Sequence, residues 1–161
     1  MCNNTWIAIG SNMNNPKIQA DFAIKYLKKL PKTKIIKCSK YYRSKPFGIK
    51  NQPDFLNAVV QLYTCLSPKK LLINLKKIEH ERGRIRNINR WGPRTLDLDI
   101  LLFANNTYNF SNLIIPHYDI YNRSFFLYPL LEVSPNLIFP DGTTLMYRLS
   151  KVQHDNLKLW K

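Results

Sequence analysis

Residues 55–63 read FLNAVVQLY, an alternation of the kind that a half-buried β-strand shows. Successive side chains of a strand point to opposite faces of a sheet. The even-numbered positions here are all apolar, so they predict the face that packs against helices. The odd-numbered positions begin with an aromatic ring and an amide, Phe55 and Asn57, and predict a second face open to a ligand.

The segments around this stretch predict the rest of the fold. Runs rich in apolar, β-branched or aromatic residues predict further strands, and prolines at helix starts followed by apolar residues at helical spacing predict two helices. The resulting β-α-β-β-α-β order is typical of the ferredoxin-like motif, an α+β sheet with its helices on one face. Beyond residue 105 we expect a C-terminal hairpin, a short helix near residues 123–132 and a tail. The expected strands are residues 5–10, 34–42, 55–63 and 96–103, and the expected helices are residues 16–30 and 68–82.

The length and composition fit one domain spanning residues 1–161. No apolar run approaches the roughly 18 residues of a membrane span, and the N-terminus lacks the basic region of a signal peptide. The cysteines, Cys2, Cys38 and Cys65, are odd in number and far apart, which argues against a disulfide framework or a thiolate zinc site. We therefore expect free thiols in a reducing cytoplasm, and a monomer.

The charge balance is 25 basic against 10 acidic residues, a formal net charge of +15. Such a charge attracts polyanions, and nucleic acid is the first class to consider. The lysines are scattered, however, so we interpret most of them as a solvated surface. The local feature is a cluster of arginines, whose guanidinium groups make bidentate contacts to phosphate. An RNA-facing loop is the alternative interpretation of this cluster, which comprises Arg82, Arg84, Arg86, Arg90 and Arg94.

Asp97 and Asp99 follow the arginines and share one face of the last predicted strand, with Leu98, Ile100 and Leu102 expected behind them. Two adjacent carboxylates repel each other and are costly to desolvate. The alternative interpretation is two solvated acids at the end of a strand. A divalent cation removes both problems, and Mg²⁺ favours few carboxylates together with phosphate oxygens and water. Carboxylates for metal beside arginines for phosphate are typical of phosphoryl transfer. By this argument Asp97→Asn or Asp99→Asn leaves the metal-free fold as stable as before, or more so.

Other sites are less specific. Phe55 could stack on a flat heterocycle that Asn57 hydrogen-bonds, although a ring at the edge of the core beside a solvated amide fits equally well. His117 has no second histidine at ligand spacing, so zinc is rejected, and it is either structural or a nucleotide contact. Glycine is scarce and no P-loop or G-x-S-x-G motif is present, so an ATP site would not be of the Walker or kinase type.

Together these segments resemble the 6-hydroxymethyl-7,8-dihydropterin pyrophosphokinases of folate biosynthesis. The resemblance runs from residue 7 to about residue 142, and residues 90–101, RWGPRTLDLDIL, look like the family's diagnostic motif. It implies a reaction in which ATP and the pterin alcohol give AMP and the pterin diphosphate, with two Mg²⁺ ions and three mobile loops. The other matching segments are IAIGSN at residues 7–12, QPDFLN at 52–57, PHYD at 116–119 and NRSF at 122–125.

The resemblance also implies roles for individual residues. Asp97 and Asp99 resemble the metal ligands, and Arg84 and Arg94 resemble the arginines that assist transfer. The pterin would lie between Phe55 and Phe125, with Asn57 and the chain at Ser44, Pro46 and Phe47 around its edge. The implied nucleotide contacts are Glu79, Arg86, Trp91, Ile100, His117, Tyr118 and Arg123.

Four positions depart from the family pattern. Lys45 and Phe55 stand where many members have proline and tyrosine, so the loop at Lys45 is expected to be looser and the ring lacks a hydroxyl. Lys76 and Asn112 stand where glutamine and arginine are frequent, which bears on ATP affinity rather than on the reaction.

The rival function from another class is an RNA-binding module, which the fold class and the charge allow. It would need aromatic residues on central strands for base stacking, and residues 5–10 offer only Trp6. Asp97 and Asp99 would also repel a phosphate backbone. We therefore expect pterin and ATP as partners, and neither nucleic acid nor membrane.

Overall fold

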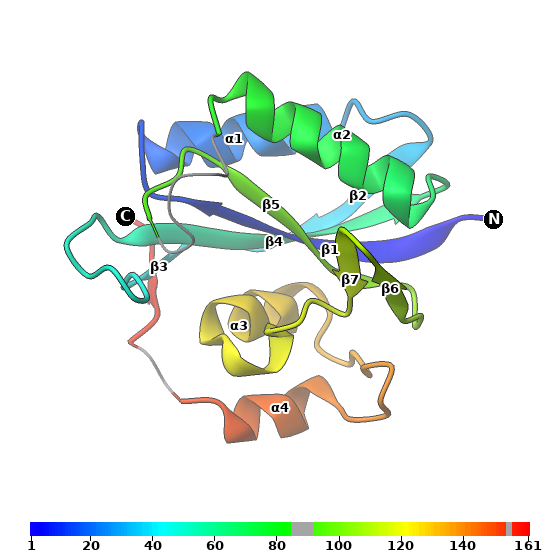
Figure 1. The fold of residues 1–161 in the computed structure, drawn as a ribbon. Helices are drawn as coiled ribbons and strands as arrows, with labels where there is room; N and C mark the ends of the chain where they lie inside the picture. The colour runs from blue at the N-terminus through cyan, green and yellow to red at the C-terminus, as the bar shows by residue number, and fades with distance from the viewer. Residues whose placement is uncertain (85–91, 154–155) are drawn as a thin grey trace.

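The structure is a computed structural model that describes residues 1–84, 92–153 and 156–161. Its central feature is an antiparallel sheet with helices on both sides (Figure 1). The elements are β1 (Asn3–Ser11), α1 (Pro16–Leu27), β2 (Thr33–Cys38), β3 (Tyr42–Ser44), β4 (Phe55–Thr64), α2 (Pro68–Glu81), β5 (Asp97–Phe103), β6 (Tyr108–Phe110), β7 (Leu113–Ile115), the 3₁₀ helix η1 (Ile120–Asn122), α3 (Ser124–Val133), α4 (Leu145–Lys151) and β8 (Lys158–Leu159).

The sheet has the order β5-β1-β4, with β2 and β3 both pairing with β4 and β8 pairing with β3. The pairs β1–β4, β1–β5 and β2–β4 are all antiparallel. The order β5-β1-β4-β2 confirms the predicted ferredoxin-like sheet. The predicted C-terminal hairpin is also present, as β6 and β7.

Helices α1 and α2 cover one face of the sheet, as predicted (Figure 1). Each begins with proline after a capping side chain: Asn15 accepts from the main-chain N–H of Ile18, and Ser67 accepts from that of Lys70. The even-numbered apolar residues of β4 are all buried in the cluster beneath these helices. The alternation of β4 therefore identified the helix-facing side correctly.

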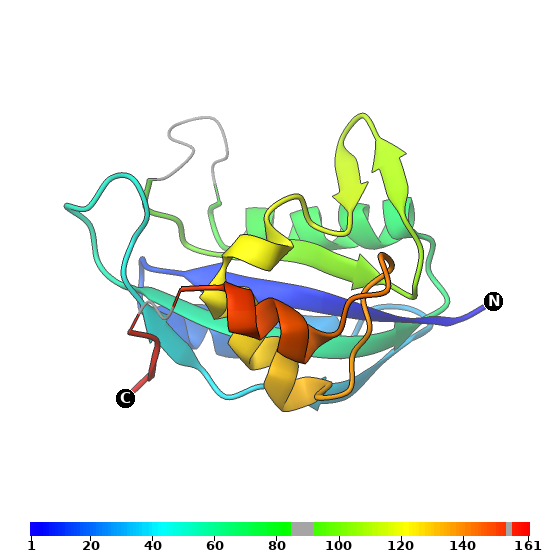
Figure 2. The same ribbon diagram turned by 90° about the horizontal axis from the view of Figure 1, so that it is seen from below.

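The opposite face is not left open as expected, because α3 and α4 cover much of it (Figures 1 and 2). A second apolar cluster joins these helices to β1, β4 and β5, with Trp6 and Val59 among its members. Trp6 is only 7% exposed, and its indole N–H donates to Ser134 at 2.8 Å. The aromatic residue that an RNA-stacking surface would need is therefore buried.

Two strand predictions need correction. The expected strand at 34–42 is two strands: β2 ends at Cys38, and a separate β3 begins at Tyr42 and continues to Ser44. Leu98 and Ile100 do pack on the helix side, but Leu102 lies in the opposite cluster. The β1–β5 register shifts between Trp6 and Ile7, and a bulge of this kind changes which face the following residues occupy.

The expectation of free thiols was wrong for two cysteines, because Cys2 and Cys65 form a disulfide. They are 63 residues apart in the sequence, but β1 pairs Asn3 with Thr64 and so brings the flanking cysteines together. Spacing along the chain could not show this. Cys38 is a free, partly buried thiol. Among the described residues, the helices are too short or too polar to cross a membrane.

Candidate active site

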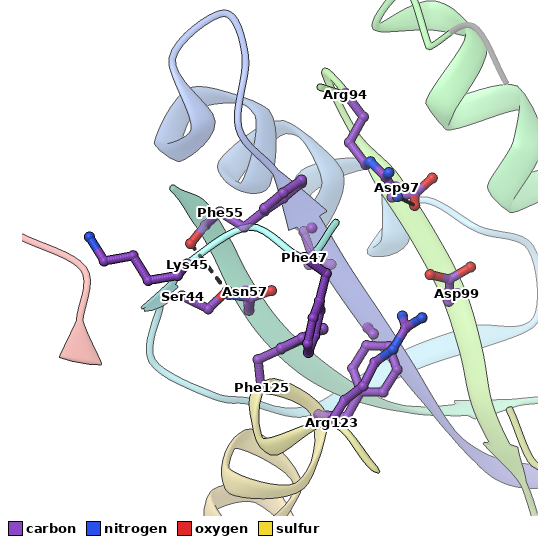
Figure 3. A pocket seen from close by; sticks show the side chains of 14 residues that line it. Ser44, Lys45, Phe47, Phe55, Asn57, Arg94, Asp97, Asp99, Arg123 and Phe125 are labelled. Carbon is purple, nitrogen blue, oxygen red and sulfur yellow. Dashed lines mark hydrogen bonds and ion pairs between the residues drawn. The ribbon is translucent and has the colours of Figure 1, made fainter. Parts of the chain in front are cut away.

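The part of the sheet that α3 and α4 leave uncovered forms a pocket (Figure 3). Arg94, Asp97 and Asp99 lie on one side of it, and Phe55, Asn57 and Phe125 lie on the other. Its cavity is about 70 Å³, smaller than the roughly 300–1,000 Å³ of ordinary ligand pockets. The predicted phosphate side and the predicted heterocycle side thus meet in one small cavity.

Asp97 is the electrostatic centre of the phosphate side. Its Oδ1 accepts from Nε of Arg84 at 3.1 Å and its Oδ2 accepts from Nη1 of Arg94 at 2.9 Å. The side chains of Asp97, Arg84 and Arg94 are 11%, 9% and 17% exposed, so these ion pairs are largely shielded from water. The structure therefore joins both predicted transfer arginines to one predicted metal ligand.

The arginine cluster does not act as one unit. Arg82 turns toward α1, where its Nε donates to Gln19 at 2.8 Å and its guanidinium lies 4.1 Å from the centre of the Phe22 ring. Arg86, Arg90 and Trp91 lie outside the described residues. Of the predicted cluster, the structure places Arg84 and Arg94 at the carboxylates.

Glu79 is 2% exposed, and its carboxylate accepts from the main-chain N–H of Leu98 at 2.7 Å. Leu98 lies between Asp97 and Asp99, so Glu79 fixes the strand that carries both of them. Sequence reasoning assigned Glu79 to nucleotide, and its described hydrogen bond adds a role in positioning β5. Ile100, another expected nucleotide contact, buries its side chain on the helix side, which leaves its main chain for such a contact.

The carboxylates suit Mg²⁺ by their chemistry. Asp97 and Asp99 both line the pocket, and carboxylate oxygens are the protein ligands that Mg²⁺ favours. Among the described residues, no group of three or more His, Cys, Asp or Glu side chains gathers as a metal cage. A pair of carboxylates fits an ion that completes its shell with phosphate oxygens and water.

Asn12 is a residue that sequence reasoning missed as part of the site. Asn12 is 2% exposed. Its Oδ1 accepts from the main-chain N–H of Arg94 at 2.8 Å, and its main-chain N–H donates to the Arg94 carbonyl at 3.0 Å. Its Nδ2 donates to Gln52 and to the carbonyl of Pro53. Asn12 thereby ties the phosphate side of the pocket to the chain that leads into β4. The signal was the polar G-S-N at the end of the segment IAIGSN, which matches the family but was given no site role.

On the heterocycle side, Asn57 is 5% exposed, and its Nδ2 donates to Ser44 Oγ at 2.7 Å. This hydrogen bond links β4 to β3 and fixes the amide orientation, with the Oδ1 and Nδ2 atoms at the pocket wall. The Arg94 guanidinium lies 5.4 Å from the centre of the Phe55 ring, within the range of a cation–π interaction. Phe55 therefore contacts both halves of the site.

Phe47 occupies part of the space where a ligand would lie. Its ring centre is 5.8 Å from that of Phe125, at an interplanar angle of 52°. Figure 3 shows Phe47 reaching into the pocket from the loop after β3. A flat ring between Phe55 and Phe125 requires Phe47 to move aside. Phe47 is itself 43% exposed.

The segment 117–123 brings Arg123 to the pocket. Arg123 lines the pocket, and its Nε donates to Asp119 at 2.7 Å. Nδ1 of His117 accepts from the main-chain N–H of Asp119 at 3.1 Å, which leaves Nε2 to carry the proton of the neutral ring. Burial, and then the positive charge of Arg123, lower the pKa of His117 to about 4. Tyr118 stacks on His117 but is 60% exposed, so it lies on the outer side of this segment.

The remaining expected residues lie at the margins. Pro46 is buried in the wall of a neighbouring cavity. The Lys45 ammonium is 3.5 Å from Asp54, and its side chain is 78% exposed. Lys76 and Asn112 are exposed on α2 and at the β6–β7 turn, outside the walls of the main pocket.

A model of the 7,8-dihydro-6-hydroxymethylpterin-pyrophosphokinase family matches residues 6–135. The 2-amino-4-hydroxy-6-hydroxymethyldihydropteridine pyrophosphokinase of Haemophilus influenzae is 44% identical over 155 residues, covering 96% of each chain. Its counterpart from Pseudomonas aeruginosa is 44% identical over 145 residues, covering 90% of this chain and 89% of that one.

A solved structure has the same fold. The Plasmodium falciparum HPPK-DHPS structure with pteroate superposes with a TM-score of 0.74 at 15% identity, over 94% of this chain and 42% of that longer chain. The match over residues 6–135 includes both sides of the pocket, and the two bacterial relatives match along nearly their whole length. The chain therefore belongs to the 7,8-dihydro-6-hydroxymethylpterin pyrophosphokinase family.

Proposed function

We propose that this chain transfers the pyrophosphate group of ATP to the hydroxyl of 6-hydroxymethyl-7,8-dihydropterin, giving the pterin diphosphate and AMP. Family membership and the names of the relatives support the reaction. The observation that carries it is the joining of two chemistries in one pocket: carboxylates with arginines, and aromatic rings with a fixed amide. A pterin alcohol bound by the rings would direct its hydroxyl toward phosphates bound on the other side.

The pterin side selects a flat, hydrogen-bonding heterocycle. Phe55 and Phe125 offer ring faces for stacking, and Asn57, whose Nδ2 donates to Ser44 and to the Phe55 carbonyl, would offer its Oδ1 as an acceptor at the ring edge. The Ser44–Asn57 hydrogen bond holds the amide in place before the ligand arrives. Binding then costs little side-chain ordering, apart from the displacement of Phe47.

The phosphate side would take the triphosphate of ATP. Asp97 and Asp99 would hold Mg²⁺, which when bound neutralises phosphate charge and helps to align the reacting groups. Arg84 and Arg94 already converge on Asp97, and a bound triphosphate would bring phosphate oxygens to these guanidinium groups. Arg123 and the neutral Nε2–H of His117 would provide further donors at the far end of the pocket.

The pterin oxygen forms a bond to the β-phosphorus while the bond from that phosphorus to the oxygen of the α-phosphate breaks. AMP leaves with the bond electrons, and the hydroxyl proton passes to solvent. A loose transition state depends mainly on alignment and charge neutralisation rather than on a strong base. Arg84 and Arg94 would stabilise the charge that develops, and Phe47 closing over the site would keep water from competing with the pterin.

Incubation of the protein with ATP, Mg²⁺ and the pterin alcohol tests this function directly. The expected products are AMP and the pterin diphosphate in equal amounts. Formation of ADP, or release of AMP without pterin, would reject pyrophosphate transfer. Phe55→Ala and Asn57→Ala should weaken pterin binding and spare the binding of an ATP analogue, and a pterin affinity unchanged in both would place the pterin elsewhere.

Within this proposal the chain works as a cytoplasmic monomer that binds neither nucleic acid nor membrane. Size-exclusion chromatography of the pure protein tests the oligomeric state, and cell fractionation tests the location. RNA binding would show itself by an affinity that falls steeply as salt rises, whereas the enzyme requires Mg²⁺ and ATP.

A further inference from the structure

The last residues of the chain return to the pocket. Strand β8 pairs with β3 through Tyr42 with Leu159 and Arg43 with Lys158. The main-chain N–H of Trp160 donates to the carbonyl of Tyr41 at 2.8 Å. Figure 1 shows the C-terminus beside β3. This segment lies beyond residues 6–135, the part that the family model matches.

Strand β3 is the element that needs support. It has only 3 residues, and β4 pairs with one of its edges. A strand this short is weak with one neighbour, and its open edge would expose unpaired main-chain groups. Ser44, the last residue of β3, fixes the amide of Asn57. Any looseness in β3 would therefore reach the residue that is expected to read the pterin edge.

Trp160 and Arg43 fasten β8 to β3 from the side. The Arg43 guanidinium lies 3.9 Å from the centre of the Trp160 ring, and its Nη1 lies 3.7 Å from a carboxylate oxygen of Asp54. Asp54 immediately precedes Phe55. One guanidinium thus connects the C-terminal tail, β3 and the start of β4. On the opposite face, the Tyr42 hydroxyl donates to Glu132 of α3, so the strand is held from both sides.

The tail also borders the loop that follows β3. A cavity of about 270 Å³ next to the main pocket is lined by Asn156 of the tail together with Ser44, Phe47 and Phe125. The tail therefore lies against the outer side of the residues that surround the expected pterin site. This contact is independent of the strand pairing.

We propose that β8, with Trp160 packed on Arg43, is a positioning element that holds β3 and the following loop for pterin binding. The proposal rests on the proposed function, because it assigns this side of the pocket to the pterin. Trp160 lies outside the walls of the main pocket and acts through β3. The tail should affect the pterin and leave the nucleotide unaffected, since Arg84, Asp97 and Asp99 are held by β5 and Glu79 instead.

The test compares Trp160→Ala with Trp160→Phe, which keeps a ring for Arg43, and with Tyr147→Ala, which removes an exposed aromatic ring on α4. We expect Trp160→Ala to raise the KM for the pterin alcohol roughly two- to fivefold, the range of one partly exposed cation–π contact. Its kcat and its Kd for an ATP analogue should stay at the parent values. Trp160→Phe and Tyr147→Ala should match the parent in all three quantities.

Deletion of residues 158–161 should raise the pterin KM further, and calorimetry with the pterin and an ATP analogue should show the same order of affinities. A parent-like pterin KM in Trp160→Ala, with an active parent, overturns the positioning role alone. Equal losses for both substrates, or the same loss in Tyr147→Ala, would show a general effect on stability and would also overturn it. A parent that makes no pterin diphosphate would instead refute the proposed function, and this inference with it.

Discussion

Replacing Asp97 by asparagine should destabilise the metal-free protein, although the sequence alone predicts the reverse. Two carboxylates on one strand face repel each other, which is the basis of the sequence prediction. The structure gives Asp97 two guanidinium partners, Arg84 at 3.1 Å and Arg94 at 2.9 Å. Attraction to two positive charges within hydrogen-bonding distance outweighs repulsion by one neighbouring carboxylate.

The magnitude follows from the burial of this cluster. Removing one partner of a buried ion pair costs roughly 3–5 kcal/mol, because a charge is left behind without compensation. Asparagine keeps one acceptor oxygen for one of the arginines, so we expect a loss of about 2–3 kcal/mol. For a chain of this length, that loss lowers Tm by roughly 5–10 °C.

Asp99→Asn is the matched control, since it removes a negative charge from the same strand face. Thermal melts in metal-free buffer measure the effect of each substitution. In the same melts, Mg²⁺ with an ATP analogue should raise the Tm of the parent strongly and that of both variants weakly, because amides are poor ligands for Mg²⁺.

Turnover separates the two roles of Asp97, as an ion-pair partner and as a metal ligand. Both variants should lose most of the Mg²⁺-dependent release of AMP, and Asp97→Asn should also lose the stability that its two arginine partners contribute. An Asp97→Asn protein that melts at or above the parent temperature would refute the electrostatic reasoning. Full activity in either variant would refute the assignment of these residues to the metal.

Four further expectations test separate parts of the molecule. Arg94→Ala should lower kcat by roughly 10²–10³-fold, far more than it weakens the binding of an ATP analogue, and the opposite pattern would make Arg94 mainly a ground-state contact. Phe125→Ala should weaken pterin binding by about 1–3 kcal/mol in calorimetry, and an unchanged affinity would show that the ring does not stack on the pterin. Reducing the Cys2–Cys65 disulfide, which closes a separation of 63 residues, should cost up to about 4 kcal/mol of stability in urea unfolding, and three free thiols in the native, unreduced parent, instead of Cys38 alone, would contradict the linkage. Burial lowers the pKa of His117 to about 4, so the neutral ring contributes its full stability above pH 6.5 and loses that contribution as the pH falls toward 4. Between pH 7.5 and 5 the free energy of unfolding of the parent should therefore fall by about 2 kcal/mol more than that of His117→Asn. Equal losses in both proteins would exclude the buried neutral ring.

Local pattern was enough to predict much of the fold. The alternation of residues 55–63 and the proline-led helices depend on neighbours within a few positions, and the structure confirms them. The short strands β3 and β8 could not be found this way. Each has too few residues for a period to show, and each is stabilised by a partner that is distant in the sequence.

Within the candidate site, residue types were easier to predict than partners. Carboxylates two positions apart indicated a shared face, and the structure places Asp97 and Asp99 in the pocket wall. No local pattern could show that Arg82 turns toward α1 while Arg84 reaches Asp97. Such choices depend on which helix face and which strand end meet, and that is decided by the packing of the whole sheet.

The arrangement of the carboxylates and arginines suggests why the ligand-free site is stable at all. A site that binds a polyanion and a cation carries both positive and negative side chains, and these need partners before the ligands arrive. Here Asp97 and the two arginines satisfy one another inside the protein, and Asn12 and Glu79 hold the main chain that carries them. Binding of ATP with Mg²⁺ would replace each of these internal partners by one of the same charge sign: the metal for the guanidinium groups, and phosphate for the carboxylate. Because the exchange conserves the charge balance, we expect the ligands to bind without a large rearrangement of β5, whereas a ring between Phe55 and Phe125 requires Phe47 to move.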